Sequence, residues 1–548
     1  MEISAQALQW RILDGGKNDP REAPLISVKA YEGLIRNYQS LASELDVSID
    51  GCDRRAREEK LIVAAYERWG TDMGLHLNGQ FALALYDDSA DQLFCARDIL
   101  GAELFFYYVT AEGKLLYATQ IKDLFDQDGF VRKLNEDMVQ FYMGFTYLPG
   151  EETLFEGVWK LAPGGYLLFD QDGLKKGTYW ELSFEPDESK TLDDWADEIS
   201  AAMDESLACV IDADQTPDSF LSGGVDSSYI LAKSRARMGV CAAYENQQAS
   251  EEDQARETAT YLGREFTGVT VSPTEFLDTL DEFLTAFEIP TADMAALSLY
   301  CAAKQMVGKS EVCFSGEGAD EFFAGYSVYT KANRYKFTTN PVYHGTTYIM
   351  APSEQKRFVK TFNPGRSTRD FMRERGAAGR KYDTVGWMLY TDLRSYFEGS
   401  ILYNSTKISR GTGLDIRMPY CDLRIFEISR RMPTRFKVSD EGNKLALRKA
   451  ASRVLPQEVA YRKKLGFPVP VRAWMATPEY QAEITKAFES ETAKKFFQED
   501  ELQALLNAFL GKKPKVHRLW YKRHEALLWR YVWTIFTFIR WYDLFFKD

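Results

Sequence analysis

Hydrophobic residues in the first third of the chain come in short runs that polar turns interrupt. NGQFALALYDD (78–88) is an apolar run closed by a polar turn. Three runs rich in aromatic and β-branched residues follow at short spacing: QLFCARD, ELFFYYVT and KLLYATQ. The segment from LAPGGYLLFDQDG to YWELSF predicts one more hairpin, and LIVAAYERWG (61–70) has the spacing of a helix that ends at Gly70. We therefore expect a first domain rich in strands.

The pattern changes after an acidic polar stretch, PDESKTLDDWADE, around residues 186–197. Such a stretch between two apolar patterns is typical of a linker or a helix start, so we predict domains of residues 1–185 and 190–548. Beyond it, strand-like runs such as VCAAYE alternate with helical ones such as YILAKSRARMG and SLYCAAKQMVG. This alternation predicts parallel strands covered by helices, the α/β architecture of nucleotide-binding proteins.

The rest of the chain has a mainly helical pattern and ends in a very aromatic segment, RLWYKRHEALLWRYVWTIFTFIRWYDLFF. We expect a terminal helix packed on the core, with a membrane-surface helix as the alternative. The most apolar stretch, Tyr531 to Ile539, is nine residues long and lies between Arg530 and Arg540, too short for a membrane span. The first residues, MEISAQALQW, lack the pattern of a secretory signal.

Composition narrows the functional classes. The 548 residues are 45% hydrophobic and 14% aromatic, which excludes a mainly disordered or fibrous chain. The net charge of −14 argues against a general nucleic-acid role, because such binding needs a basic face. The seven cysteines are widely scattered, which suits neither a disulfide framework nor a metal cluster, and buried thiols such as Cys313 are expected. We expect a cytoplasmic protein.

The most specific motif is a glycine-rich loop after a predicted strand and before a predicted helix. It reads Ser222-Gly223-Gly224-Val225-Asp226-Ser227-Ser228. Small residues there let successive backbone N–H groups converge on an anion, and the helix N-terminus adds its positive end. The loop lacks the GxxxxGK[ST] of a Walker motif. Its SGGxDS form resembles the PP-loop of ATP pyrophosphatases, which cleave between the α and β phosphates; the alternative is a purely structural turn.

A second string, Ser315-Gly316-Glu317-Gly318-Ala319-Asp320-Glu321, also follows an apolar strand. Loops at the ends of neighbouring parallel strands converge where such sheets bind ligands. Asp226 and Asp320 are therefore candidate Mg²⁺ ligands, because Mg²⁺ prefers a few carboxylates plus phosphate oxygens. Ser315 and Gly316 join the candidate nucleotide-binding residues. Either aspartate alone could also be a helix cap.

Together these strings resemble the asparagine synthetase family, whose other branches include β-lactam synthetases and lasso-peptide cyclases. The resemblance runs through nearly the whole chain and includes GLDIRMPYCD (413–422), similar to the family's GLExRxPFLD. It also includes Lys444 in KLALRKA and Lys464 in YRKKLGFPVP, which match two phosphate-facing lysines, although either alone would be typical of a solvated surface charge. It implies an Ntn-like αββα sandwich followed by a PP-loop synthetase domain with a HUP-like parallel sheet and a helical C-terminal part.

The resemblance also implies a reaction that uses ATP and Mg²⁺. A carboxylate is activated as an acyl-adenylate with release of pyrophosphate, and ammonia or an amine then forms the amide. Lys464, with Lys444 behind it, would neutralise developing charge. Glu317 would act as acid or base on the attacking nitrogen. Asp415 replaces the Glu of the LExR motif and is one methylene shorter.

The first domain resembles a class II glutaminase that has lost its machinery. Glutamine hydrolysis there depends on an N-terminal Cys, whose own α-amine is the base. This sequence begins Met1-Glu2-Ile3, and its first cysteine is Cys52. The family's Asn-Gly aligns with Glu32-Gly33, and the glutamine-gripping RGPD segment has no counterpart. We expect glutamine hydrolysis to be lost.

Two observations bear on the partners. In β-lactam synthetases the position of Glu317 is a Tyr, so Glu317 favours intermolecular amide formation, whereas the missing Cys is compatible with an intramolecular cyclase. The family's DRxSM is Thr406-Lys407-Ile408-Ser409-Arg410 here, which makes aspartate a doubtful substrate. The expected partners are a small-molecule or peptide carboxylate and an amine, with a homodimer as one expected assembly. The alternatives are a non-catalytic binding protein and another PP-loop chemistry such as sulfur transfer to tRNA.

Overall fold

The computed structural model describes residues 26–212, 214–244, 251–335, 342–463 and 469–547. It divides the chain into two compact units. Unit 1 comprises the described residues up to Thr119 together with Leu161–Glu181, and unit 2 comprises Gln120–Lys160 and the described residues from Leu182 onward. The chain thus passes from unit 1 into unit 2 at Gln120 and returns to unit 1 at Leu161. It leaves unit 1 again at Leu182, close to the polar stretch that the sequence marks as a boundary.

The elements of unit 1 are β1 (Ile26–Ile35), α1 (Tyr38–Leu45), α2 (Arg54–Trp69), η1 (Gly70–Leu75), β2 (Gly79–Asp87), β3 (Gln92–Arg97), β4 (Phe106–Val109), β5 (Leu115–Ala118), β7 (Gly165–Asp170) and β8 (Gly173–Thr178). The strands of unit 2 are β6 (Trp159–Lys160), β9 (Asp218–Phe220), β10 (Met238–Tyr244), β11 (Glu265–Val271), β12 (Val312–Phe314) and β13 (Asp415–Arg417). Its helices up to residue 402 are η2 (Ile121–Leu124), α3 (Asp137–Phe145), α4 (Leu192–Cys209), α5 (Val225–Lys233), α6 (Glu251–Tyr261), α7 (Pro273–Asp278), α8 (Leu280–Phe287), α9 (Met294–Met306), α10 (Ala319–Phe322), α11 (Ser327–Tyr335), α12 (Pro352–Phe358), α13 (Thr368–Arg375), η3 (Ala377–Lys381), α14 (Thr384–Asp392) and the π-helix η4 (Leu393–Leu402). Its later helices are α15 (Tyr403–Thr412), α16 (Leu423–Arg431), η5 (Thr434–Phe436), α17 (Leu445–Ala451), α18 (Gln457–Ala460), α19 (Val471–Trp474), α20 (Pro478–Phe488), α21 (Glu491–Phe496), α22 (Glu499–Phe509), α23 (Arg518–Arg523), η6 (Glu525–Leu527) and α24 (Leu528–Phe546).

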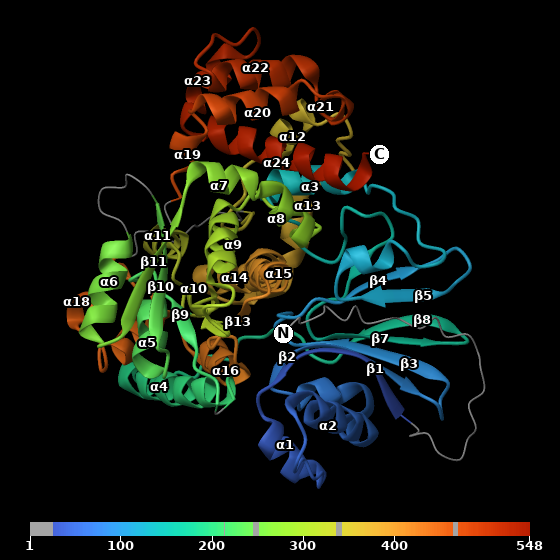
Figure 1. The fold of residues 1–548 in the computed structure, drawn as a ribbon, viewed down its shortest axis with the longest axis vertical. Coiled ribbons are helices and arrows are strands. Elements are labelled where there is room, and N and C mark those ends of the chain that lie inside the picture. The colour runs from blue at the N-terminus through green and yellow to red at the C-terminus, as the bar shows by residue number, and fades with distance from the viewer. Residues whose placement is uncertain (1–25, 213, 245–250, 336–341, 464–468, 548) are drawn as a thin grey trace. The chain divides into compact units, whose positions relative to one another are not determined.

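Unit 1 is a layered sandwich built on a five-stranded sheet with the order β1-β2-β3-β7-β8, in which all neighbours are antiparallel. Helices α1 and α2 lie on one side of this sheet, and the antiparallel pair β4–β5 lies on the other (Figure 1). Side chains from both layers meet in one core that includes Ala84, Cys95, Phe105 and Leu167. This arrangement confirms the strand-rich, Ntn-like first domain that the sequence predicts.

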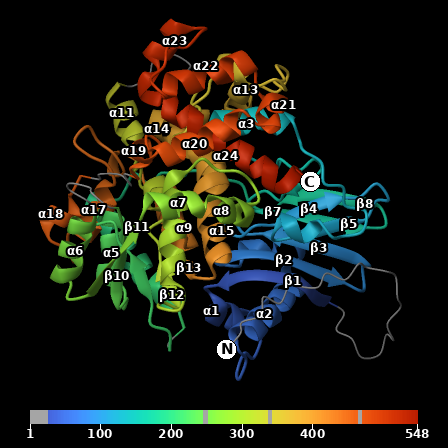
Figure 2. The same ribbon diagram turned by 45° about the horizontal axis from the view of Figure 1, so that its top comes forward.

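The central sheet of unit 2 is parallel throughout, with the order β11-β10-β9-β12-β13. Helices α5 and α6 cover one face, and α9 and α15 cover the other (Figures 1 and 2). The strand order reverses between β9 and β12, because the chain first builds the sheet outward to β11 and then returns to the other side of β9. Ligands bind outside the carboxyl ends of the strands at such a switch point.

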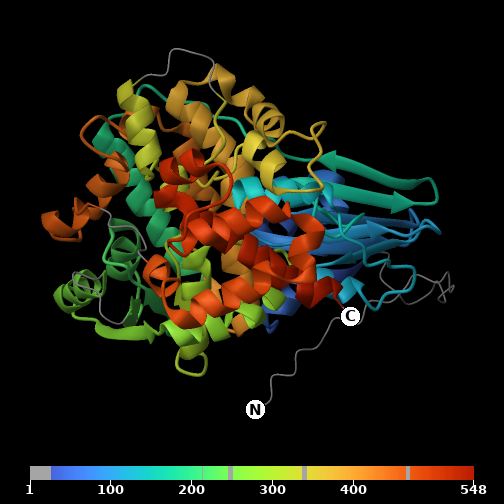
Figure 3. The same cartoon turned by 90° about the horizontal axis from the view of Figure 1, so that it is seen from above.

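The C-terminal helices form a bundle around α24, which packs against α8, α20, α21 and α22 (Figure 3). Trp533 and Trp541 of α24 are among the largest fully buried side chains of the described chain. This burial confirms the prediction of a terminal helix packed on the core rather than on a membrane surface. Among the described residues, no helix combines the length and apolar character that a membrane crossing requires.

The segment Gln120–Lys160 packs in unit 2, although the sequence prediction drew one domain over residues 1–185. The reason lies in α3, whose residues from Met138 to Phe145 are all buried. Within this helix the Tyr142 hydroxyl lies 2.6 Å from Thr537 Oγ1 of α24. A helix that is apolar on all sides has to be enclosed by other elements, and α24 supplies part of that enclosure.

Candidate active site

The two predicted loops lie side by side at the carboxyl ends of β9 and β12. Register pairs Phe314, the last residue of β12, with Ser219 of β9. The loop of residues 222–228 follows β9 and leads into α5, and the loop of residues 315–321 follows β12 and leads into α10. The sheet thus brings both strings to its switch point.

The loop after β9 is held by its own serines. Ser222 N–H donates to Ser227 Oγ at 3.1 Å, and Gly224 N–H donates to Ser222 Oγ at 3.4 Å. Gly223 has a φ of +72°, and a Cβ there would lie 2.7 Å from the Gln254 side chain, so the position needs glycine. Ser228 is fully buried in the first turn of α5. These contacts set the loop at the positive N-terminal end of α5.

The loop after β12 packs directly on the first loop through its glycines. A Cβ at Gly316 would lie 3.5 Å from both Asp226 Cβ and Ser227 N. Gly318 has a φ of +97°, which favours glycine. Ser315 is buried and its N–H donates to the Arg417 carbonyl of β13 at 2.9 Å. The small residues of this string therefore permit the close approach of the two loops.

Lys444 joins the two candidate metal ligands. Its Nζ lies 2.5 Å from Asp226 Oδ2 and 2.7 Å from Asp320 Oδ1. The lysine side chain is 2% exposed, and the two carboxylates are 15% and 13% exposed. One ammonium thus balances part of the charge of two neighbouring carboxylates, which in low dielectric would otherwise repel one another. The structure brings together three of the residues that the sequence singled out.

Backbone conformation makes this ion triad possible. Lys444 has a φ of +54° and precedes α17, so its side chain enters the site from a left-handed turn. At Gly325 a Cβ would lie 1.8 Å from Asp320 Oδ1 and 2.1 Å from Lys444 Cε. Only glycine at position 325 leaves room for the pair. The sequence analysis did not single out Gly325, although it directly extends the second string as part of FFAGY.

The donor set fits Mg²⁺. Asp226 Oδ1 is buried and has no hydrogen-bond partner among the described residues, so this oxygen remains open to a cation. Carboxylate oxygens together with phosphate oxygens are the ligands that Mg²⁺ prefers. Asp226 and Asp320 are the residues that would hold the ion.

Two glutamates of the second loop differ in their surroundings. Glu317 is half-buried, and its carbonyl lies 3.6 Å from Cys421 Sγ. Glu321 is buried and accepts a hydrogen bond of 2.5 Å from the Tyr326 hydroxyl. Burial, followed by the charges of Asp320 and Glu317, raises the pKa of Glu321 to about 8. Perturbed acids of this kind cluster at functional sites, and the sequence analysis had not assigned Glu321 a role.

One predicted site residue, Asp415, lies away from this cluster. Asp415 is the first residue of β13 and pairs with Val312, the first residue of β12, so it lies at the amino ends of the strands. Its Oδ2 accepts from Arg417 Nη2 at 2.7 Å and Nε at 3.0 Å. Lys464 lies outside the described residues. Arg462, which precedes it in the chain, donates to the Gly223 carbonyl at 3.2 Å, a contact that the sequence analysis missed.

In unit 1, Arg97 and Asp98, which end the run QLFCARD, are buried and stabilise the fold. Asp98 is fully buried and accepts backbone N–H groups from Ala102 at 3.0 Å and Glu103 at 2.9 Å, while burial raises its pKa. Arg97 is equally buried and donates to the carbonyl of Leu161 at 2.6 Å. Gly33 lies in β1 with a φ of +146°, and a Cβ there would lie 2.1 Å from the Gln80 carbonyl oxygen. These residues hold the sheet together.

The parallel sheet, its switch-point loops and the acid–lysine triad define a nucleotide-binding α/β protein joined to an Ntn-type domain. Comparison with known proteins agrees: the asparagine synthase family model matches residues 198–543, and the glutamine amidotransferase domain model matches residues 21–180. The chain belongs to the asparagine synthase family, and it is therefore related to ATP-dependent carbon–nitrogen ligases.

Named relatives extend over most of the chain. Asparagine synthetase [glutamine-hydrolyzing] 1 of Bacillus subtilis is 28% identical over 94% of this chain and 85% of its own. A putative asparagine synthetase [glutamine-hydrolyzing] of Mycobacterium tuberculosis is 30% identical over 87% of this chain and 78% of its own. Amidase chry2 of Gibberella zeae is 26% identical over 49% of this chain and 43% of its own. Among solved structures, the glutamine phosphoribosylpyrophosphate amidotransferase of B. subtilis aligns over 44% of this chain and 45% of its own, with 10% identity and a TM-score of 0.20, a likeness too weak to bear on function.

Proposed function

We propose that this protein is an ATP-dependent ligase that joins a carboxylate to ammonia or an amine. The observation that carries the proposal is the meeting of Asp226, Asp320 and Lys444 beside the serine–glycine loop at the switch point. In the first step a substrate carboxylate oxygen attacks the α-phosphorus of ATP, and pyrophosphate leaves with the electron pair of the broken P–O bond. In the second step the nitrogen attacks the acyl carbon, AMP leaves, and the nitrogen gives up a proton.

The residues of the two loops suit the first step. The backbone N–H groups of the first turn of α5, at residues 225–227, would bind phosphate oxygens, because the first N–H groups of a helix have no intrahelical partner. Lys444 is held in place by two carboxylates, so its charge needs no reorganisation as negative charge builds on the departing pyrophosphate. Mg²⁺ held by Asp226 and Asp320 would, when bound, add positive charge to the same oxygens.

The second loop suits the second step. Glu317 is half-buried on the loop that packs against Asp226, where it can take the proton from an attacking nitrogen. Glu321, with its pKa raised to about 8, is a second acid in the same loop that can hold a proton near neutral pH. The presence of Glu317 favours an external amine over an amine on the same molecule.

We infer further that glutamine hydrolysis is lost. At the position of Glu32, the glutaminase domains that unit 1 resembles have Asn. Gly33 has a structural reason, because β1 approaches β2 closely at that point. Of the two described cysteines of unit 1, Cys52 is partly exposed but lies within the chain, so it has no α-amine of its own to act as base. Cys95 is fully buried in the core, where burial raises the pKa of its thiol. A buried neutral thiol is a poor nucleophile.

Transfer of ¹⁸O from the substrate carboxylate to AMP tests directly whether an acyl-adenylate forms. Carboxylic acids, led by aspartate and N-carboxyalkylated amino acids, would be screened with ATP, Mg²⁺ and an ammonium salt for release of AMP. The active acid would then be supplied with ¹⁸O in its carboxylate, and the AMP would be examined by mass spectrometry. One ¹⁸O in AMP is expected, because the carboxylate oxygen stays with phosphorus when the amide forms; unlabelled AMP, or ADP as product, would contradict the proposal.

A further inference from the structure

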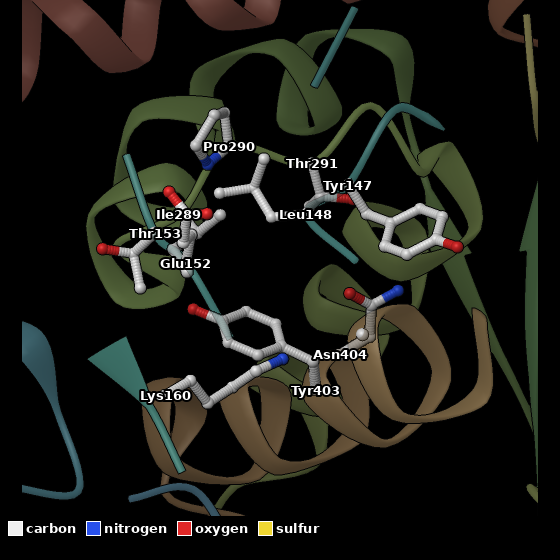
Figure 4. A pocket seen from close by; sticks show the side chains of 11 residues that line it. Tyr147, Leu148, Glu152, Thr153, Lys160, Ile289, Pro290, Thr291, Tyr403 and Asn404 are labelled. Carbon is white, nitrogen blue, oxygen red and sulfur yellow. The ribbon is translucent and has the colours of Figure 1, made fainter. Parts of the chain in front are cut away.

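A small cavity in unit 2 lies among Tyr147, Ile289 and Asn404 (Figure 4). Its volume of about 10 Å³ has room for about one water molecule. Such a water would donate to Asn404 Oδ1, which is buried and has no hydrogen-bond partner among the described residues. The cavity is therefore too small for a substrate.

Arg448 of α17, four positions after Lys444, holds two separate segments with its guanidinium group. Its Nε donates to the Asn443 carbonyl at 2.9 Å, and its Nη2 donates to Asn443 Oδ1 at 3.1 Å. Its Nη1 donates to the carbonyls of Ala460 at 2.8 Å and Arg462 at 3.1 Å. Because Arg448 is buried, these bonds are shielded from water, and they fix the residue before Lys444 relative to the segment 460–462.

Asn443 links Arg448 to the ion triad. Its Nδ2 donates to the Gly325 carbonyl, and the Gly325 N–H donates to the Asp320 carbonyl at 2.8 Å. Asn443 also directly precedes Lys444, which has a left-handed backbone conformation, so the position of Asn443 decides where that turn begins. The close approach of Gly325 to Lys444 and Asp320 therefore depends on the bonds that Arg448 makes to Asn443.

Arg462 reaches from the second of these segments to the serine–glycine loop. Its Nη1 donates to the Gly223 carbonyl at 3.2 Å, and its Nη2 lies 2.6 Å from Glu257 Oε2. In a trans peptide the carbonyl and the following N–H point in opposite directions, so the bond to Gly223 also fixes the direction of the Gly224 N–H. Gly224 is the N-cap of α5. Arg462 thus fixes the peptide from which the first turn of α5 starts, and with it the N–H groups that would bind phosphate.

We propose that Arg448 and Arg462 are positioning residues that hold Lys444 and the first turn of α5 in one arrangement for the departing pyrophosphate. The inference rests on the proposed ligase function and names the side chains that couple its two phosphate-binding parts. Each arginine acts through the backbone that it bonds. Arginine suits this task because its planar guanidinium donates to several acceptors at fixed angles, whereas lysine supplies the same charge from a single nitrogen.

The test measures binding of pyrophosphate without a carboxylic acid, so it does not depend on adenylation. Isothermal titration with magnesium pyrophosphate and, separately, with AMP would be performed on the full chain and on Arg448→Lys and Arg462→Met. AMP lacks the pyrophosphate part, so its affinity reports whether the rest of the nucleotide site is intact. Arg453→Met is the matched control, because Arg453 follows α17 but pairs with Asp193 of α4 at 3.5 Å. Thermal melts would establish that each variant is folded.

We expect the affinity for pyrophosphate to fall at least about tenfold in Arg448→Lys and in Arg462→Met, the scale of losing one hydrogen bond to a charged group. The affinity for AMP should change little in both, and Arg453→Met should bind both ligands as the unaltered protein does. This difference between the two ligands would not arise from a loss of stability alone.

Unchanged affinity for pyrophosphate in Arg448→Lys would overturn the inference, because it would show that charge alone suffices. Equal losses for AMP and pyrophosphate would overturn it as well, because they would indicate general damage to the fold, and so would absence of pyrophosphate binding to the unaltered protein. Failure of the proposed function would appear differently, as the absence of AMP formation with every acid while pyrophosphate still binds as expected.

Discussion

At the scale of single residues, the site depends on charges that compensate one another over short distances. Lys444 and Asp226 are 218 positions apart in the chain, yet their side chains are in contact at the switch point. Local patterns predicted the aspartates, because each follows a strand in a glycine-rich string. They could not predict the partner of Lys444, because the contact arises only when α17 packs against α4 and α5. The role of Gly325 could not be predicted for the same reason, because its lack of a side chain matters only where Lys444 packs against it.

Removal of Lys444 is expected to cost both activity and stability. In Lys444→Met the carboxylates of Asp226 and Asp320 lose their common counter-ion, and breaking a buried ion pair in this way costs about 3–5 kcal/mol. Urea denaturation would measure the loss. The double variant Lys444→Met/Asp226→Asn removes one of the opposed charges, so it is expected to recover part of the stability; a double variant less stable than Lys444→Met would argue against the charge account.

Gly325→Ala tests the packing of the same site. Its methyl group would overlap Asp320 Oδ1 and Lys444 Cε, so we expect the triad to be displaced and AMP formation to fall by about 100-fold, the scale of losing one electrostatic contact in a transition state. Gly442→Ala is the matched control, because a Cβ there would meet only Leu445 Cδ2 at 3.8 Å. Similar rates for both alanine variants would show that the close approach at position 325 is unimportant.

The buried side chain of Lys437 makes the stability of unit 2 depend on pH, and the direction of this dependence can be predicted. It is 3% exposed, its Nζ donates to Ser429 Oγ at 3.2 Å, and burial lowers its pKa to about 7. Between pH 7 and 10 the unfolded chain holds this proton and the folded chain does not, so the free energy of unfolding gains about 1.4 kcal/mol per pH unit from this group. Below pH 7 that gain is absent. Urea denaturation at pH 7.5, 8.5 and 9.5 should show a smaller slope in Lys437→Met; an unchanged slope would mean that Lys437 is charged in the folded protein.

At the scale of elements, the short apolar runs between polar turns predicted β2, β3 and the β7–β8 hairpin well, because each strand has at least six residues and is bounded by a turn. It missed β13, which has three residues and forms only because β12 offers an edge. The π-helix η4 gave no signal either, since its composition is that of an ordinary buried helix. Asp415 shows the consequence. The motif around it was recognisable from the sequence, but whether it lies at the amino or the carboxyl ends of the parallel strands depends on the register of β13.

The terminal helix α24 is expected to be a principal source of stability. Trp541 is fully buried, and its Nε1 donates to the Glu288 carbonyl at 2.8 Å. Trp541→Ala should lower the free energy of unfolding by about 3–5 kcal/mol, the usual cost of such a truncation. Leu544→Ala on the same helix, where the side chain is 40% exposed, should cost far less. Equal effects of the two substitutions in denaturant titrations would contradict the packing described for α24.

At the scale of the whole molecule, the chain combines an Ntn-type domain with a synthetase domain of the asparagine synthase family. The sequence predicted both parts, because their motifs are local and specific. The passage of Gln120–Lys160 into unit 2 could not be predicted, since it depends on which surface encloses the apolar helix α3.

Loss of glutaminase activity in unit 1 can be tested directly. We expect no release of glutamate from glutamine in a coupled assay, with or without ATP and the carboxylic acid. Steady formation of glutamate would contradict the inference that glutamine hydrolysis is lost.

The central claim is that the switch-point site activates a carboxylate with ATP. Exchange of ³²P-labelled pyrophosphate into ATP, with Mg²⁺ and the carboxylic acid that supports AMP formation, measures that step without any amine. We predict exchange that requires the acid and falls by about 10²–10³-fold in Asp226→Asn and in Lys444→Met, while Gly442→Ala retains it. Exchange at the unaltered rate in Asp226→Asn and Lys444→Met would show that the reaction takes place elsewhere.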